Sequence, residues 1–312
     1  MPNSNSDTSP GSRSVTHTIR RLLASYIQPR DAAMAELEAE LAAERGRAAR
    51  LDEAHNAAKQ EIARLNEKVA GLQSATSFTP ISVARPPLLF QPPELTVKQQ
   101  AVVDQFHKLM YDITDQNSFR SYCVSWLGYG MLKWPTDMWN YQEIIAETMP
   151  DVIVETGTHR GGSALFFATI CDLIQKGEVI SVDIDDSFRA NQPVHPRLTF
   201  LSGSSTDPAI VADIERRIAG RTNVFVILDS DHRRDHVLDE LRIYSKFVPV
   251  GGHLVVEDTN VNGHPVYPEF GPGPREAVDQ FLTENRQFEV DRSQERFYFT
   301  HNPYGFLRRR SA

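Results

Sequence analysis

The feature that most constrains the fold is a short apolar run, a glycine-broken turn and a longer apolar run in "VIVETGTHRGGSALFFA", residues 152–168. The first run is typical of a buried strand, and the second is long enough for a helix. A helix that begins at the end of a strand presents free backbone N–H groups to a ligand, as in nucleotide-cofactor sites. The segment therefore predicts an α/β domain that binds such a cofactor.

Strand and helix patterns go on alternating after this segment. We expect strands at 151–156, 178–184, 197–203, 224–230 and 251–259, and helices at 162–175, 208–219, 235–248 and 273–285. Repeated βαβ units predict a doubly wound, parallel, Rossmann-like sheet with helices on both faces. Two further strands, at 288–292 and 296–300, are close in sequence and predict an antiparallel C-terminal edge. Helical stretches near 97–112 and 137–148 precede the sheet.

The N-terminal part of the chain has a different pattern. We expect residues 1–30 to be a mostly disordered tail with a short amphipathic helix, and residues 31–73 to be a coiled coil. Two heptad positions carry the apolar seam: Met34, Leu41, Ala48, His55, Ile62 and Val69, and Leu37, Glu44, Leu51, Ala58, Leu65 and Leu72. The coiled coil predicts a homo-oligomer, with the catalytic domain as a further candidate contact.

A proline-rich linker is expected at 74–96, followed by the catalytic domain at 97–312. The net charge of -8 and the pI near 5.7 argue against a nucleic-acid partner. Two distant cysteines, Cys123 and Cys171, indicate neither a disulfide framework nor a zinc knuckle. No apolar run approaches the roughly 18 residues of a transmembrane segment, and no secretory signal is visible. We therefore expect a cytoplasmic location.

The glycine turn departs from a dinucleotide fingerprint because His159 would crowd a pyrophosphate. Glu155, which ends the first strand, suits a cofactor with a positive amino group, such as S-adenosylmethionine. Asp183 ends the second strand and can accept hydrogen bonds from ribose hydroxyls, a placement that NAD enzymes share. Tight packing between helix and strand is the alternative explanation of the glycines.

Carboxylates end the next two strands, in "DSDH" (229–232) and "EDT" (257–259). Neighbouring parallel strands would bring Asp229 close to Glu257 and Asp258, and three carboxylates repel one another unless a cation neutralises them. Oxygen ligands suit Mg²⁺. His232 would face the same crevice and serve as general base for a hydroxyl. Helix capping by such residues is the alternative. His236, four residues on, is expected on a helix face.

Several motifs together resemble the cephalosporin hydroxylase/rhamnosyl O-methyltransferase family: "PDVIVETGTHRGGSALFFA", "GSSTD", "VILDSDH", "LVVEDT", "GPGPREAV" and "ERFYFTHNPYGFLRR". The resemblance runs from about residue 135 to the C-terminus and implies a class I methyltransferase fold. It also implies Asp229, Glu257 and Asp258 as metal ligands and His232 as base. The cofactor contacts that it implies are Glu155, Gly157, Gly161, Ser163, Asp183, Ser204 and Ser205, with Tyr141 and Gln142 as further candidates.

The sequence therefore predicts a Mg²⁺-dependent S-adenosylmethionine O-methyltransferase that acts on a hydroxyl of a saccharide or another small-molecule acceptor. An oxygenase or hydroxylase component is the rival enzyme, and it would need a redox centre. The non-enzymatic alternative is a scaffold protein that binds S-adenosylmethionine without turnover. In such a protein we would expect one or more of Asp229, His232, Glu257 and Asp258 to be replaced. The acceptor itself is not specified by the fold.

Overall fold

The structure, a computed structural model, describes residues 11–75, 91–116 and 124–311. The chain divides into two compact units, Met1–Thr79 and Pro80–Ala312. Residues 1–10 of the tail expected at 1–30, most of the linker expected at 74–96, and Cys123 lie outside the described residues.

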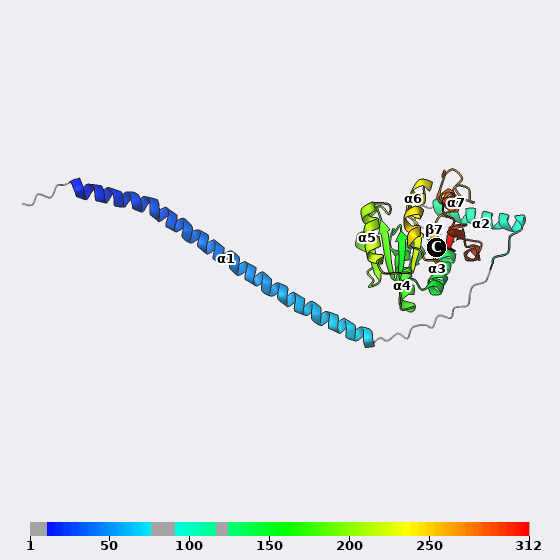
Figure 1. Cartoon of the computed structure of the whole chain (residues 1–312), viewed down its shortest axis with the longest axis horizontal. Helices are drawn as coiled ribbons and strands as arrows, with labels where there is room; N and C mark the ends of the chain where they lie inside the picture. The colour runs from blue at the N-terminus through cyan, green and yellow to red at the C-terminus, as the bar shows by residue number, and fades with distance from the viewer. Residues whose placement is uncertain (1–10, 76–90, 117–123, 312) are drawn as a thin grey trace, which may run out of the picture. The chain divides into compact units, whose positions relative to one another are not determined.

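The first unit contains one helix, α1, which spans Gly11–Ala75 without interruption (Figure 1). Residues 11–30, expected to be mostly disordered apart from a short amphipathic helix, are therefore helical and continuous with the expected coiled-coil segment. Large apolar side chains of the predicted seam are exposed, among them Leu37, Leu51 and Ile62. A second copy of the helix would be needed to bury them, so the coiled coil stays a prediction.

The second unit is built on a sheet of seven strands in the order β5-β4-β3-β6-β7-β9-β8. Its parallel part consists of β3 (Val152–Thr156), β4 (Glu178–Asp183), β5 (Leu198–Ser202), β6 (Val224–Leu228) and β7 (His253–Val256). The chain reverses its direction of winding at β3, which lies between β4 and β6. In such sheets ligands bind beyond the carboxyl ends of the strands at this reversal point.

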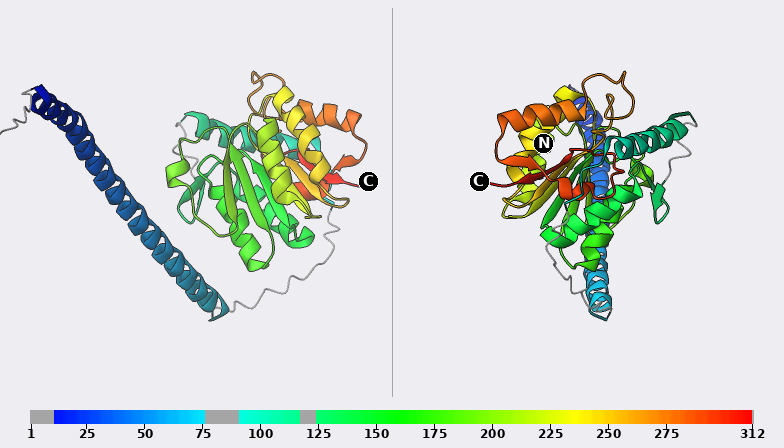
Figure 2. Two further views of the ribbon diagram at one scale, coloured as in Figure 1. Left: turned by 60° about the vertical axis from the view of Figure 1, so that its left-hand side comes forward. Right: turned by 90° about the vertical axis from the view of Figure 1, so that its right-hand side faces the viewer.

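Helices cover both faces of the sheet, as predicted (Figure 2). One apolar cluster joins the sheet to α5 (Pro208–Ile218), α6 (Arg234–Tyr244) and α7 (Pro274–Glu284). A second cluster, on the other face, contains α3 (Pro135–Thr148) and α4 (Gly162–Leu173). Helix α2 (Val97–Gln116) precedes these elements, and its buried His107 ring lies 2.8 Å from the Thr300 carbonyl.

The antiparallel edge is confirmed, but one of its two strands was placed wrongly by the sequence pattern. Strand β8 covers Phe288–Val290, whereas its partner β9 is Phe306–Arg309 and lies between β7 and β8. The expected strand at 296–300 is irregular instead. The Thr300 hydroxyl and the His301 backbone N–H both donate hydrogen bonds to the buried Asp137 carboxylate of α3. These bonds hold the segment against α3 and not at the edge of the sheet.

A short hairpin that the sequence analysis did not predict precedes α3. It pairs β1 (Val124–Trp126) with β2 (Tyr129–Met131). The hairpin packs closely on the start of α4, because a Cβ atom at Gly162 would lie 2.5 Å from the carbonyl oxygens of Tyr129 and Gly130. This contact carries the residues that follow β2, including Lys133, to the carboxyl ends of the strands.

Candidate active site

A cavity of about 520 Å³ lies where the carboxyl ends of the central strands meet. Its walls come from five strand ends, from the loop before α3 and from the start of α6. Sequence-predicted residues that line it are Gly157, Ser163, Asp183, Ser204, Ser205, Asp229, His232 and Asp258. The prediction that these residues share one crevice is therefore consistent with the structure.

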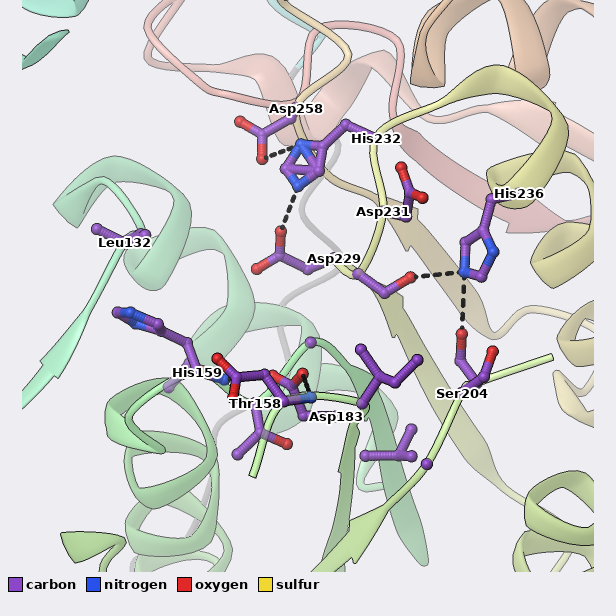
Figure 3. A pocket seen from close by; sticks show the side chains of 18 of the residues that line it. Leu132, Thr158, His159, Asp183, Ser204, Asp229, Asp231, His232, His236 and Asp258 are labelled. Carbon is purple, nitrogen blue, oxygen red and sulfur yellow. Dashed lines mark hydrogen bonds and ion pairs between the residues drawn. The ribbon is translucent and has the colours of Figure 1, made fainter. Parts of the chain in front are cut away.

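Asp229, His232 and Asp258 converge at this cavity (Figure 3). The His232 ring lies between the two carboxylates: its Nδ1 is 3.1 Å from Asp258 Oδ2, and its Nε2 is 3.8 Å from Asp229 Oδ1. One ligand atom from each residue falls within 4.8 Å of the others. Asp258 has a φ of 53°, which is uncommon for a residue other than glycine and turns the chain immediately after β7. The three side chains form a set that could hold a metal ion.

Lys133 is the residue of this site that the sequence analysis missed. Its side chain is 2% exposed, and its Nζ lies 2.5 Å from Asp229 Oδ2, 2.6 Å from Glu257 Oε1 and 3.8 Å from Glu155 Oε1. A lysine in the apolar stretch "YGMLKWP" was the only signal, and lysines are rarely buried without a partner. The chain thus supplies a cation of its own to the buried carboxylates.

Glu257, predicted as a metal ligand, lies beneath the cavity and not in its wall. Its Oε1 accepts hydrogen bonds from Lys133, at 2.6 Å, and from the Tyr141 hydroxyl, at 2.7 Å. The structure therefore separates it from the group of Asp229, His232 and Asp258. Both residues follow β7, and the chain turns at Asp258, whose φ is 53°, so Asp258 lines the cavity while Glu257 does not.

Tyr141 and Gln142 do not line the cavity, contrary to the prediction that they approach the cofactor. Tyr141 is fully buried, and its hydroxyl also accepts a hydrogen bond from Asn302 at 3.0 Å. It supports Glu257 from below. The sequence motif "WNYQEI" could not show this, because the direction of a helix face depends on how the helix packs.

Burial is the dominant influence on the ionisable groups here. It raises the pKa of Asp229 to about 6 and that of Glu257 to about 7, against the opposing effect of Lys133. Burial by itself lowers the pKa of Lys133, but the charges of Asp229, Glu257 and Glu155 outweigh it and hold that pKa well above its ordinary value. The site thus keeps an ammonium ion and holds the carboxylates of Asp229 and Glu257 close to protonation at neutral pH.

Glu155 is fully buried and does not line the cavity. It accepts hydrogen bonds from the hydroxyls of Ser163, at 2.6 Å, and Ser181, at 2.7 Å. Burial raises its pKa, and the charge of Lys133 opposes that rise. We predicted that Glu155 contacts the cofactor directly. In the structure Ser163, which donates a hydrogen bond to Glu155, lines the cavity in its place.

The glycines of the turn have different roles. Gly157 lines the cavity at a φ of 85°, and a Cβ atom there would lie 1.8 Å from the Asp229 carbonyl oxygen. Gly161, at a φ of 79°, instead faces Pro193 and Phe200 and lies outside the cavity wall. Gly157 is therefore required where β3 and β6 end side by side, whereas Gly161 is explained by packing, the alternative noted from the sequence.

Asp183 is held by the loop of His159. Its Oδ2 accepts the His159 backbone N–H at 2.7 Å, and its Oδ1 accepts the Asp185 N–H at 2.9 Å. The His159 ring packs edge-on against Phe188, with centroids 5.0 Å apart. Each carboxylate oxygen keeps a further lone pair that could accept a hydroxyl.

His236, expected on a helix face, lines the cavity. Its Nε2 lies 3.1 Å from Ser230 Oγ and 3.2 Å from Ser205 Oγ, and the neighbouring Glu240 raises its pKa. Ser204 also lines the cavity, and its hydroxyl lies 3.1 Å from that of Thr206. Hydroxyls, the His236 imidazole and the nearby Asp231 carboxylate make this wall polar.

None of the helices in the described ranges has the length and apolar character needed to span a membrane.

A profile of the family "Rhamnosyl O-methyltransferase/CmcI" matches residues 118–310, more than half of the chain. The rhamnosyl O-methyltransferase of Mycobacterium tuberculosis (strain ATCC 25618 / H37Rv) is 40% identical over 216 residues, which cover 66% of this chain and 84% of that protein. The protein of the same name from Mycobacterium leprae (strain TN) is 39% identical and covers 67% of this chain and 91% of its own.

Among solved structures, the apo structure of CmcI is 19% identical, with a TM-score of 0.48 and coverage of 73% of this chain and 90% of that one. The resemblance inferred from the sequence motifs is confirmed by the family match and by the identity to the mycobacterial proteins. The chain belongs to the rhamnosyl O-methyltransferase/CmcI family.

Proposed function

We propose that the protein is an O-methyltransferase that uses S-adenosylmethionine and Mg²⁺ to methylate a hydroxyl of a sugar. The observation that carries the proposal is the convergence of Asp229, His232 and Asp258 on the cavity that Gly157 and Asp183 also line. Membership of the family, whose mycobacterial members are named rhamnosyl O-methyltransferases, supports the reaction class and a sugar acceptor.

The cavity residues fit S-adenosylmethionine. Asp183 keeps lone pairs for ribose hydroxyls, although backbone N–H groups already bind both of its oxygens. Ser163 donates its hydroxyl hydrogen to Glu155, so its oxygen is free to accept from a positively charged amino group. Gly157 leaves the floor of the cavity open between these two residues. When bound, the cofactor supplies an electrophilic methyl group.

The donor set also fits a magnesium ion. Three carboxylates, those of Glu155, Asp229 and Glu257, pair with the ammonium of Lys133, and Asp258 adds a fourth in the cavity wall, so the site carries excess negative charge when they are ionised. Asp229 and Asp258 face the cavity and would hold the ion with oxygen atoms, as Mg²⁺ prefers. We assign Glu257, through its bonds to Lys133 and Tyr141, the positioning of Asp229 and its neighbours. This ion would acidify a bound acceptor hydroxyl.

His232 is best suited to the role of general base. An imidazole is a poor ligand for Mg²⁺ compared with a carboxylate or water. Asp258 lies 3.1 Å from Nδ1 and can hold the ring in the tautomer in which Nε2 has a free lone pair. The ring is one-third exposed and faces the cavity, where it can take the proton of an acceptor hydroxyl.

The first test is calorimetric titration of S-adenosylmethionine, S-adenosylhomocysteine and NAD into the full chain, with and without Mg²⁺. We expect both adenosyl ligands to bind and NAD not to bind. Methyl transfer to rhamnosyl glycosides, followed by mass spectrometry, then tests the acceptor class. Absence of adenosyl binding in either condition would contradict the proposal.

The rival functions make different predictions in the same experiments. An oxygenase built on two histidines and a carboxylate would need a second histidine beside His232. Of the two nearest histidines that the structure describes, His236 points to Ser205 and Ser230. His301 lies 3.8 Å from Asp258 through its Nδ1, but it is buried and does not line the cavity. A scaffold without turnover would bind S-adenosylmethionine but leave every glycoside unmodified.

A further inference from the structure

Helix α1 exposes an apolar seam over the part whose side chains the structure describes, from residue 34 to residue 65. The large members of the seam are between 46% and 70% exposed: Met34, Leu37, Leu41, Leu51, Ile62 and Leu65. They follow the heptad positions a and d, which face the partner helix in a coiled coil. A second helix of similar length, packed against this seam, would bury these side chains.

Four positions interrupt the apolar seam, and they restrict the orientation and register of the partner helix. Glu44 and His55 are polar, and Ala48 and Ala58 are small. In a parallel pair in register, each of these residues would face its own copy. Two Glu44 carboxylates would then meet in the least solvated part of the pair, where like charges repel strongly, and each pair of alanines would leave a gap.

An antiparallel pair removes all four mismatches in one register. When facing residues have numbers that add up to 99, each position a meets a position d of the other copy. Large side chains then meet large or small ones, and acid meets imidazole: Met34 with Leu65, Leu37 with Ile62, Leu41 with Ala58, Glu44 with His55, and Ala48 with Leu51. A slip of one heptad would instead place Glu44 against Ala48 or Ile62.

The charges beside the seam are compatible with this register. The e positions bring Glu38 to Lys59 and Arg45 to Asp52, which are opposite in charge. One g contact is adverse, between Glu40 and Glu61. These flanking residues are exposed and screened by solvent.

The adverse g contact is also weakened within the helix, because the Glu61 carboxylate is held by Arg64 at 2.7 Å in its own chain. A parallel pair would also bring opposite charges together beside the seam, Glu40 with Arg45 and Arg47 with Asp52. The seam decides between the two arrangements because its contacts are the ones removed from water.

We propose that α1 binds α1 of a second copy of this chain, antiparallel, in the register that places Glu44 against His55. The two copies of Ala75 would then lie at opposite ends of the pair, about 76 Å apart at 1.5 Å per residue. This inference does not depend on the reaction proposed above.

Disulfide trapping in the full chain tests the register. We expect Leu41→Cys protein mixed with Ala58→Cys protein to form a disulfide between the two chains, identified by peptide mapping. Ala58→Cys protein alone should not cross-link to itself, because Ala58 faces Leu41 in this register and would face its own copy only in a parallel pair. Ala42→Cys mixed with Ala57→Cys is the matched control, since these residues lie at the same height but outside the seam, and it should give little product.

Sedimentation of the unmodified full chain tests whether α1 associates at all. We expect a dimer at micromolar concentration. Glu44→Arg should raise the dissociation constant at least tenfold, because it replaces the acid that faces His55 with a bulky cation. When the imidazole is protonated, the two facing groups also repel each other. The double variant with His55→Glu should restore association. Efficient self-cross-linking of Ala58→Cys protein would overturn the antiparallel arrangement, and a monomer at all concentrations would overturn the pairing.

Discussion

Replacing Lys133 with methionine would remove the only ammonium among three buried carboxylates while keeping a side chain of similar length. Its Nζ lies 2.5 Å from Asp229 and 2.6 Å from Glu257, and the lysine side chain is 2% exposed. Removing one partner from a buried ion pair leaves uncompensated charge and costs about 3–5 kcal/mol. We expect a loss of that size in the free energy of unfolding at pH 8 in the presence of a chelator.

The loss should depend on pH in a defined direction. Without Lys133, the pKa values of Asp229 and Glu257 would rise further above their unfolded values, so the folded protein would bind protons that the unfolded chain releases. The deficit is therefore largest above these pKa values and shrinks as the pH falls. Added Mg²⁺ should also reduce the deficit, since a cation at Asp229 would replace part of the lost charge.

Denaturant unfolding followed by tryptophan fluorescence measures this effect in the catalytic unit, because the three tryptophans of the chain, Trp126, Trp134 and Trp139, all lie there. Lys246→Met is the matched control: Lys246 lies 2.6 Å from Glu215, but both side chains are exposed, and its loss should be below about 1 kcal/mol. Equal stability of the Lys133 variant and the unmodified protein at pH 8 in chelator would refute the reasoning.

Four further predictions concern single residues. His232→Gln should slow methyl transfer by about 10²- to 10⁴-fold, measured by single-turnover kinetics, without changing S-adenosylmethionine affinity by calorimetry; an unchanged rate would remove it as base. Asp258→Asn should weaken Mg²⁺ binding by more than about tenfold in calorimetry, whereas equal affinity would exclude it as a ligand. Gly157→Ala should lose about 3 kcal/mol or more in thermal unfolding, from both strain and collision with Asp229, and more than Gly251→Ala, whose φ of 83° is similar but whose Cβ would meet nothing within 4 Å. The pKa of Glu257 is raised by burial from 4.5 to about 7, so its ionisation costs stability as the pH rises from about 5 to 8. Glu257 should contribute a loss of about 3 kcal/mol over this range in the metal-free protein, and an unchanged pH slope in Glu257→Gln would contradict the assignment.

Much of the site could be predicted because chemistry and topology agree along the chain. Parallel strands end at the same edge of a sheet, so Asp183, Asp229 and Asp258 were expected to meet there, and all three line one cavity. His232 could be placed with them because it follows Asp229 by three residues. The edge strand β9 could not be located, because "RFYFT" has a stronger strand pattern than "GFLRR" and only the contacts of Thr300 with α3 decide against it.

The sequence by itself determined the family, the alternation of strands and helices, and the polar residues at the strand ends, because these depend on local periodicity and on short motifs. Tertiary structure decided which neighbour each charge has. Lys133 reaches Asp229 across 96 residues of chain, and Tyr141 reaches Glu257 across 116. No local pattern encodes such contacts, since they arise from the packing of the hairpin and α3 against the sheet. That packing places Asp258 in the cavity wall and Glu257 beneath it, although the two residues are adjacent in the sequence.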